Sequence, residues 1–121
     1  MTIAEGKDRR KSHRYFLTLP CRVVRARREA VELRGRTHNL SSKGAFFVVD
    51  GSVEPGAPIE FLVTLHQDRG ENQEVCLRCR GHVIRLEEAV SKDQLGVAAT
   101  IDRFQFIRRK IDGETSVVSN K

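Results

Sequence analysis

The feature that most constrains the fold is an alternation of apolar and polar residues with a period of two. It is longest in residues 75–83, where apolar or small side chains occupy every second position. Successive side chains of a β-strand point to opposite faces, so this pattern predicts a strand with one buried face. The same alternation recurs in residues 16–23, 31–39 and 59–65, and two further short segments, residues 45–49 and 95–101, are rich in apolar side chains. The chain is therefore predicted to be all-β.

Turn-forming residues separate these segments. Glycine and proline are frequent between residues 50 and 58, and Gly70 lies between the fourth and fifth segments. Six short strands with turns between them predict a small antiparallel barrel or sandwich. Pro20 cannot donate a hydrogen bond to a neighbouring strand, so the first strand is expected at a sheet edge or bulged there. Gly81 predicts a bulge or a close backbone approach in the fifth strand.

The end of the chain has a different period. Asp102 can cap a helix, and Phe104, Ile107 and Ile111 then recur at i, i+3 and i+7. This spacing predicts a short amphipathic helix that ends at Gly113. Its apolar face is expected to cover the open end of the strands.

Three regions differ in composition and charge. Residues 1–15 are polar and aperiodic and are predicted to form a flexible arm, residues 16–113 the folded domain and residues 114–121 a tail. Residues 1–43 contain 12 Lys and Arg against 4 Asp and Glu, and the remaining residues contain 10 against 12. The excess of positive charge at one end predicts an anionic partner, although a solvated basic surface explains it equally well.

Three arginines, Arg9, Arg10 and Arg14, lie within six residues of the arm. A guanidinium group is planar, permanently charged and suited to phosphates and to the edge of guanine, and it can stack on a base. Adjacent guanidinium groups repel each other and gain no folding energy from that arrangement. The run therefore predicts either a solvated arm or a site for a planar anion.

Asn39, Ser41 and Gly44 form a compact polar motif between the second and third strands. Asn and Ser side chains can hydrogen-bond to nearby backbone, and glycine permits a positive φ. Taken alone, the motif is most simply a tight turn without a ligand.

Together the two motifs resemble the signature of a known family. Arg10-x-x-x-Arg14 followed by Asn39-x-Ser41-x-x-Gly44 is similar, in order and spacing, to the signature of PilZ domains, small β-barrels that bind the bacterial second messenger cyclic di-GMP. The resemblance covers nearly the whole chain. It implies a six-stranded antiparallel split barrel with a short C-terminal α-helix and a flexible N-terminal arm.

The resemblance also implies a role for each residue of the motifs. Arg10 and Arg14 would hold guanine edges and phosphates, Ser41 would bond a phosphate or a base edge, and Gly44 would let the backbone come near. Asn39 would meet a guanine through its side-chain oxygen. Because Asn39 lacks the charge of the Asp that the family also uses, its hydrogen bonds to the ligand are expected to be weaker.

Four further residues are candidates for the site. In the family a basic residue before the arginine pair is associated with two intercalated ligand molecules, so Arg9 predicts a ligand dimer. Ser42, Arg85 and Gly96 are additional candidates, and an ordinary exposed strand arginine is the alternative for Arg85.

Metal binding and catalysis are not predicted. Cys76, Cys79 and His82 superficially resemble a metal motif, but an odd separation within a strand points the two cysteines to opposite faces. The four histidines show no triad spacing, and the acidic residues form no recognisable acid–base pair. The sequence therefore predicts a binding module without a cofactor and not an enzyme.

The predicted function is cyclic di-GMP binding that orders the arm and signals to an effector protein, with an output in motility, biofilm formation, exopolysaccharide synthesis or virulence. Two alternatives are a basic nucleic-acid-binding barrel and a PilZ-like adaptor that binds only protein. Nucleic acid is disfavoured because six Phe, one Tyr and no Trp supply few stacking platforms. Three cysteines, no apolar run long enough to span a membrane and no secretory signal predict a cytoplasmic protein.

Overall fold

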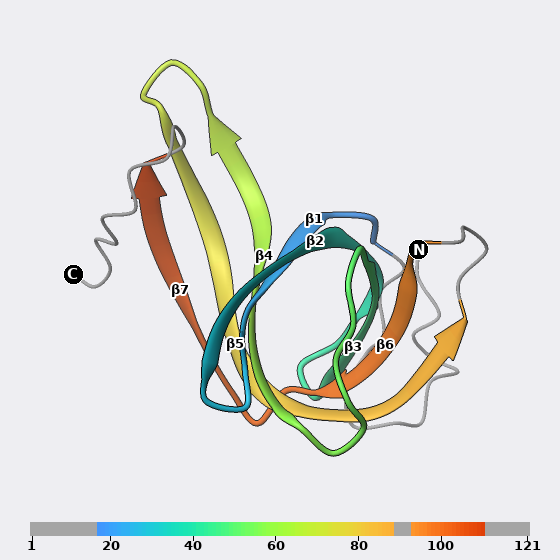
Figure 1. Cartoon of the computed structure of the whole chain (residues 1–121). Coiled ribbons are helices and arrows are strands. Elements are labelled where there is room, and N and C mark those ends of the chain that lie inside the picture. The colour runs from blue at the N-terminus through green and yellow to red at the C-terminus, as the bar shows by residue number, and fades with distance from the viewer. Residues whose placement is uncertain (1–16, 89–92, 111–121) are drawn as a thin grey trace, which may run out of the picture.

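The computed structural model describes residues 17–88 and 93–110, so the sequence predictions for the arm, the tail and residues 111–113 lie outside the described residues. The described residues form seven strands (Figure 1). Their bounds are β1 (Pro20–Ala26), β2 (Glu29–Leu40), β3 (Gly44–Val49), β4 (Pro58–Asp68), β5 (Gln73–Glu88), β6 (Leu95–Thr100) and β7 (Arg103–Lys110). The prediction of an all-β fold is confirmed for the described residues, and β1 to β6 are the six expected strands.

All pairings between these strands are antiparallel, and the sheet curls back on itself. The strand order is β4-β1-β2-β3-β6-β5-β7, and β4 pairs with β5 as well as with β1. The pairings of β1 to β6 therefore run in a closed circuit. In Figure 1 the hairpin of β4 and β5 projects from the curled part of the sheet, with β7 beside β5.

The predicted C-terminal helix is wrong within the described residues, because residues 103–110 form strand β7. Residues 73–80 of β5 pair with β4 on one side, and β7 supplies hydrogen-bonding partners on the other side. Asp102 does not cap a helix, since its carboxylate lies 2.9 Å from Nδ1 of His82. Phe104 is 50% exposed whereas Ile107 is 4% exposed, so these residues follow the period of a strand.

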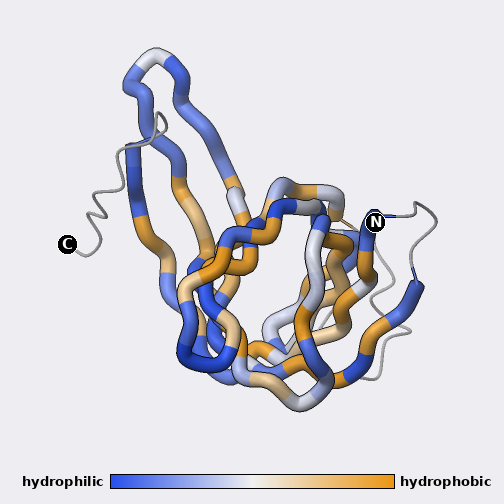
Figure 2. The backbone as a smooth tube through the Cα atoms, in the orientation of Figure 1, coloured by the Kyte–Doolittle hydropathy of each residue, from blue (hydrophilic) through white to orange (hydrophobic). Residues whose placement is uncertain are grey.

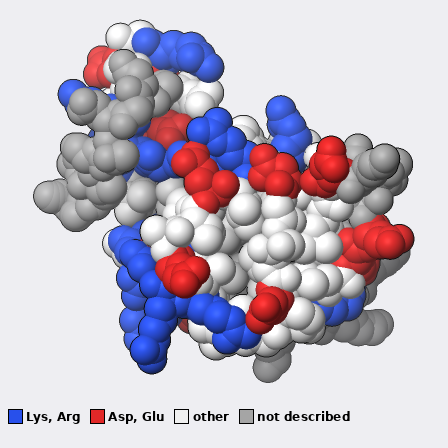
Figure 3. All heavy atoms as spheres, viewed as in Figure 1, with Lys and Arg blue, Asp and Glu red and all other residues white. Residues whose placement is uncertain are grey.

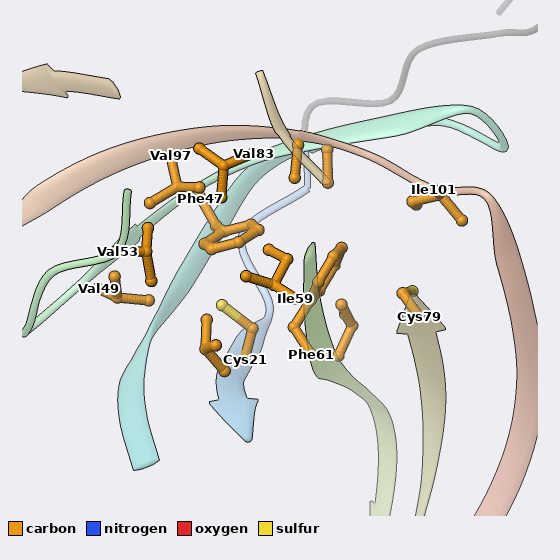
Figure 4. Close-up of a cluster of buried hydrophobic side chains, with 14 of the residues drawn as sticks. Cys21, Phe47, Val49, Val53, Ile59, Phe61, Cys79, Val83, Val97 and Ile101 are labelled. Atoms are coloured by element: carbon orange, nitrogen blue, oxygen red, sulfur yellow. The ribbon is translucent and has the colours of Figure 1, made fainter. Parts of the chain in front are cut away.

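A single main core fills the inside of the curled sheet. Its central side chains come from all six circuit strands, and Phe47 and Phe61 are fully buried with ring centroids 4.9 Å apart. Figure 4 shows these two rings among aliphatic side chains and the sulfur of Cys21. Along the backbone, hydrophobic residues concentrate in the curled part, and the tip of the β4–β5 hairpin is hydrophilic (Figure 2).

A second, smaller cluster lies on the opposite face of β4, β5 and β7. It consists of Leu62, Cys76 and Ile107, with Val24 packed against it. Cys76 belongs to this cluster and Cys79 to the main core, so the two thiols face opposite sides of β5, as their odd spacing predicts.

The prediction for β1 needs a correction. β1 is an internal strand between β2 and β4, and Pro20 is its first residue, where a missing N–H is tolerated. The irregularity in β1 lies between Val23 and Arg25. The prediction for Gly81 is confirmed as a close approach, because a Cβ there would lie 1.8 Å from the carbonyl oxygen of Thr100.

Candidate functional site

The turn between β2 and β3 is held together by Ser41. Its hydroxyl accepts hydrogen bonds from the amides of Lys43 and Gly44 at 3.2 Å each and donates to the carbonyl oxygen of Gly44 at 3.2 Å. The Ser41 amide donates to the same carbonyl oxygen at 2.9 Å. A hydroxyl offers one donor and two acceptor sites, so the turn uses all of them.

Gly44 serves close packing. A positive φ, which the sequence allowed here, is not adopted, and Gly56 is the glycine with a positive φ in the described part of the chain. A Cβ at residue 44 would lie 3.0 Å from the carbonyl oxygen of Ala99, which is tighter than nine in ten real Cβ contacts. Glycine therefore allows the end of the turn to sit against β6.

A hollow of about 420 Å³ opens beside this turn. The turn side contributes Asn39, Ser41 and Gly44, and β5 contributes Arg85. The remaining lining residues are Lys43, Ala45, Phe46, Ile84, Glu87, Ala98 and Ala99. The structure therefore brings together four residues that the sequence proposed from two distant segments.

The depth of the hollow comes from the register of three strands. Phe46 of β3 pairs with Ala98 of β6, and Ala98 pairs with Arg85 of β5. The small methyl group of Ala98 thus lies between two large side chains and leaves a depression between them. A register shift between Val83 and Arg85 places Ile84, which is 55% exposed, at the rim.

Ser42 and Gly96 do not line this hollow. Gly96 lies two residue pairs further along β6 than Ala98, and a Cβ there would be 2.9 Å from Cζ of Phe46. Gly96 therefore makes room for the Phe46 ring, which also packs edge-on against His38 with centroids 5.7 Å apart.

The charges around the hollow are mostly solvated. Arg85 pairs with Glu87 at 3.0 Å, with side chains 61% and 46% exposed, so the pair contributes little to stability. Lys43 adds a second cation to the lining. The hollow therefore carries a weak positive balance, well below what a ligand with several phosphates would need.

Arg9, Arg10 and Arg14 lie outside the described residues, but the start of the described chain is bonded to β2, the strand that carries Asn39. Thr37 of β2 is fully buried, and its hydroxyl makes two hydrogen bonds to the chain before β1. The hydroxyl donates to the carbonyl oxygen of Leu17 at 2.5 Å and accepts a hydrogen bond from the amide of Leu19 at 2.9 Å. The amide of Thr37 also donates to the carbonyl oxygen of Leu19 at 2.9 Å. Thr37 therefore fixes residues 17–19 beside β2, two residues before Asn39.

Sequence reasoning missed several residues that shape the site. Phe46 and Ala98 were assigned only to strands, because their cross-strand partners are not visible in a sequence. Thr37 carries a detectable signal, since a threonine on the inward face of an apolar alternation must satisfy its hydroxyl within the fold.

The three cysteines of the described residues are buried thiols. Burial raises the pKa of Cys21 and Cys79 to about 12 and that of Cys76 to about 11, so all three thiols stay protonated at neutral pH. Among residues 17–88 and 93–110, no group of three or more His, Cys, Asp or Glu side chains is arranged to hold a metal ion.

Comparison with known families identifies the class of this chain. The family model for the PilZ domain matches residues 8–112, which include both polar motifs and all seven strands. The chain belongs to the PilZ domain family. A search of curated proteins finds no match to it. In the part of the chain that the structure describes, no helix is long and apolar enough to cross a membrane.

Proposed function

We propose that this PilZ domain binds cyclic di-GMP at the hollow between the β2–β3 turn and β5, without catalysis, and that ligand binding orders the arm against an effector protein. We take the curled circuit of β1 to β6 as the barrel expected from the sequence. The observation that carries the proposal is the anchoring of residues 17–19 beside β2 by Thr37.

The anchoring sets how far the arginines of the arm can reach. Arg14 precedes Leu17 by three residues, so its Cα lies within about 11 Å of the anchored chain, and Arg10 within about 25 Å. Both distances allow the guanidinium groups to meet a ligand that rests on Ala98 and contacts Asn39. The arm would then supply the positive charge that the hollow lacks.

Each residue has a role in this proposal. Arg10 and Arg14 hold the phosphates and guanine edges, and Asn39 accepts a hydrogen bond from a guanine. Ser41 acts through the turn, because its hydroxyl already makes three hydrogen bonds there. Gly44 keeps the backbone close to the ligand.

Titration calorimetry with cyclic di-GMP tests the proposal. Replacing Arg10 and Arg14 together by Ala should weaken binding by at least about a hundredfold, because two charge-assisted contacts are lost. A matched control replaces Arg28 and Arg69, two exposed arginines of turns, and should change the affinity by no more than about twofold. The absence of binding by the unmodified protein, or equal losses in both variants, would contradict the proposal.

The same titration tests the ligand dimer and the effect of Asn39. We propose that the site holds two intercalated molecules and that Arg9→Ala reduces the stoichiometry from two to one. Asn39→Asp should tighten binding about tenfold, because its bond to guanine becomes charge-assisted. A stoichiometry of one for the unmodified protein would contradict the dimer and leave the site itself in place.

A further inference from the structure

A second hollow, of about 500 Å³, lies between the end of β1 and strands β4, β5 and β7, and it shares no lining residue with the first. Glu60 and Asp102 are its two acidic lining residues. Its five arginines are Arg25, Arg27, Arg78, Arg80 and Arg103. Five arginines against two carboxylates leave an excess of three positive charges with His82 neutral. Figure 3 shows Lys and Arg side chains gathered at the lower left, near the β1–β2 turn.

The strand register gathers these charges. Arg25 pairs with Glu60, Glu60 with Arg80 and Arg80 with Arg103, which makes one row across β1, β4, β5 and β7. Neighbouring strands lie about 4.8 Å apart, so the row brings its arginines within reach of one small anion. Residues that are far apart in sequence thus form a continuous basic surface.

Glu60 orients two of the arginines. The Glu60 carboxylate accepts a hydrogen bond from Nε of Arg78 at 2.7 Å and lies 3.3 Å from Nε of Arg80. The Glu60 side chain is only 13% exposed. One carboxylate cannot neutralise two guanidinium groups. The terminal nitrogens of both arginines make no hydrogen bond to another described side chain, and Arg103 forms no ion pair within residues 17–88 and 93–110.

We propose that this second hollow binds a compact polyphosphate, either the phosphate chain of a nucleoside triphosphate or inorganic polyphosphate. A guanidinium group binds a phosphate through two parallel hydrogen bonds to its oxygens. The excess of three positive charges matches a ligand with three or more negative charges. No Phe, Tyr or Trp side chain lines the hollow, so we assign the main recognition to the phosphates. A smaller adjoining hollow shares three of these arginines and is lined by Arg78, Arg80, Arg103, Phe104 and Gln105.

Calorimetry with sodium tripolyphosphate tests the proposal in the Arg10→Ala, Arg14→Ala protein, in which the proposed cyclic di-GMP site is disabled. Replacing Arg80 and Arg103 by Gln should weaken binding at least about tenfold. The control replaces Arg69 and Arg108, which are exposed and outside the hollow, and should change binding by no more than about twofold. If the double variant does not fold, Arg103→Gln alone serves as the test. This variant should fold, because Arg103 forms no ion pair with a described acidic group, and it should still weaken binding.

Comparing several ligands distinguishes the nucleoside triphosphate from inorganic polyphosphate, and both from an acidic peptide or a nucleic acid. Tighter binding of ATP than of tripolyphosphate identifies the nucleotide as the source, and equal binding identifies the phosphate chain. Absence of binding at millimolar tripolyphosphate, equal losses in the test and control variants, or tighter binding of a decaglutamate peptide or an oligonucleotide would overturn the proposal. Because different arginines are changed, failure here leaves the cyclic di-GMP titration unaffected.

Discussion

At the scale of single residues, Ser41 illustrates how a signature residue can act through backbone geometry. Ser41→Ala removes the acceptor for the amides of Lys43 and Gly44 and should lower the free energy of unfolding by about 1 kcal/mol. Ser42→Ala is the matched control, because Ser42 is exposed and the structure shows no side-chain hydrogen bond for it. Urea denaturation of both variants measures the difference, and equal stabilities would show that the hydroxyl does not hold the turn.

The buried thiols predict how stability depends on pH. Burial raises the pKa of Cys21 and Cys79 from 9.0 to about 12 in the folded protein, so above pH 9 the unfolded chain loses these protons first. The free energy of unfolding should be insensitive to the thiols below pH 9 and should fall above it, by up to about 1.4 kcal/mol per pH unit for each thiol.

Urea denaturation under reducing conditions between pH 8 and 10.5 measures this slope. Cys79→Ala should reduce the slope above pH 9, whatever its effect on stability at neutral pH. A variant with the same slope as the unmodified protein would show that Cys79 ionises equally in both states.

At the scale of elements, the close approach of β5 and β6 depends on Gly81. A Cβ at this position would lie 1.8 Å from the carbonyl oxygen of Thr100, so Gly81→Ala must push the backbones apart. We expect a loss of at least about 3 kcal/mol in the free energy of unfolding. Gly70→Ala should be nearly neutral, because its nearest contact is Oδ1 of Asp68 at 3.5 Å. Thermal unfolding compares the Gly81→Ala and Gly70→Ala variants. Similar melting temperatures would contradict the argument that Gly81 is needed for close packing against Thr100.

The elements also show where sequence patterns are sufficient. Period-two alternation located β1, β2, β4 and β5, and short apolar runs bounded by turn residues located β3 and β6, since both patterns are local properties of a strand. It failed for β7, because Phe104 and Ile107 fit both a helical and an extended pattern. Pairing with residues 73–80 of β5, which are distant in sequence, decided between the two.

At the scale of the whole molecule, the site is built from strands that are distant in sequence and adjacent in the closed circuit. The sequence can therefore indicate candidate residues but not how they are arranged. The sequence supplied candidate residues, and the structure places Asn39, Ser41 and Gly44 of one motif on the same hollow as Arg85. The floor made by Ala98 and the anchoring by Thr37 depend on register across β3, β6 and β2, and no local pattern encodes register. The second hollow could not be predicted from the sequence for the same reason, because the residues that line it come mainly from four strands.

The most direct test of the central claim is the response of backbone amide NMR resonances to cyclic di-GMP. The account predicts that the largest shifts occur at Asn39, Ser41 and Gly44 in the turn and at Ala98 on β6. Gly70 in the β4–β5 turn should not shift. Shifts centred on β7 or the β4–β5 turn, or no shifts at saturating ligand, would contradict binding at this hollow.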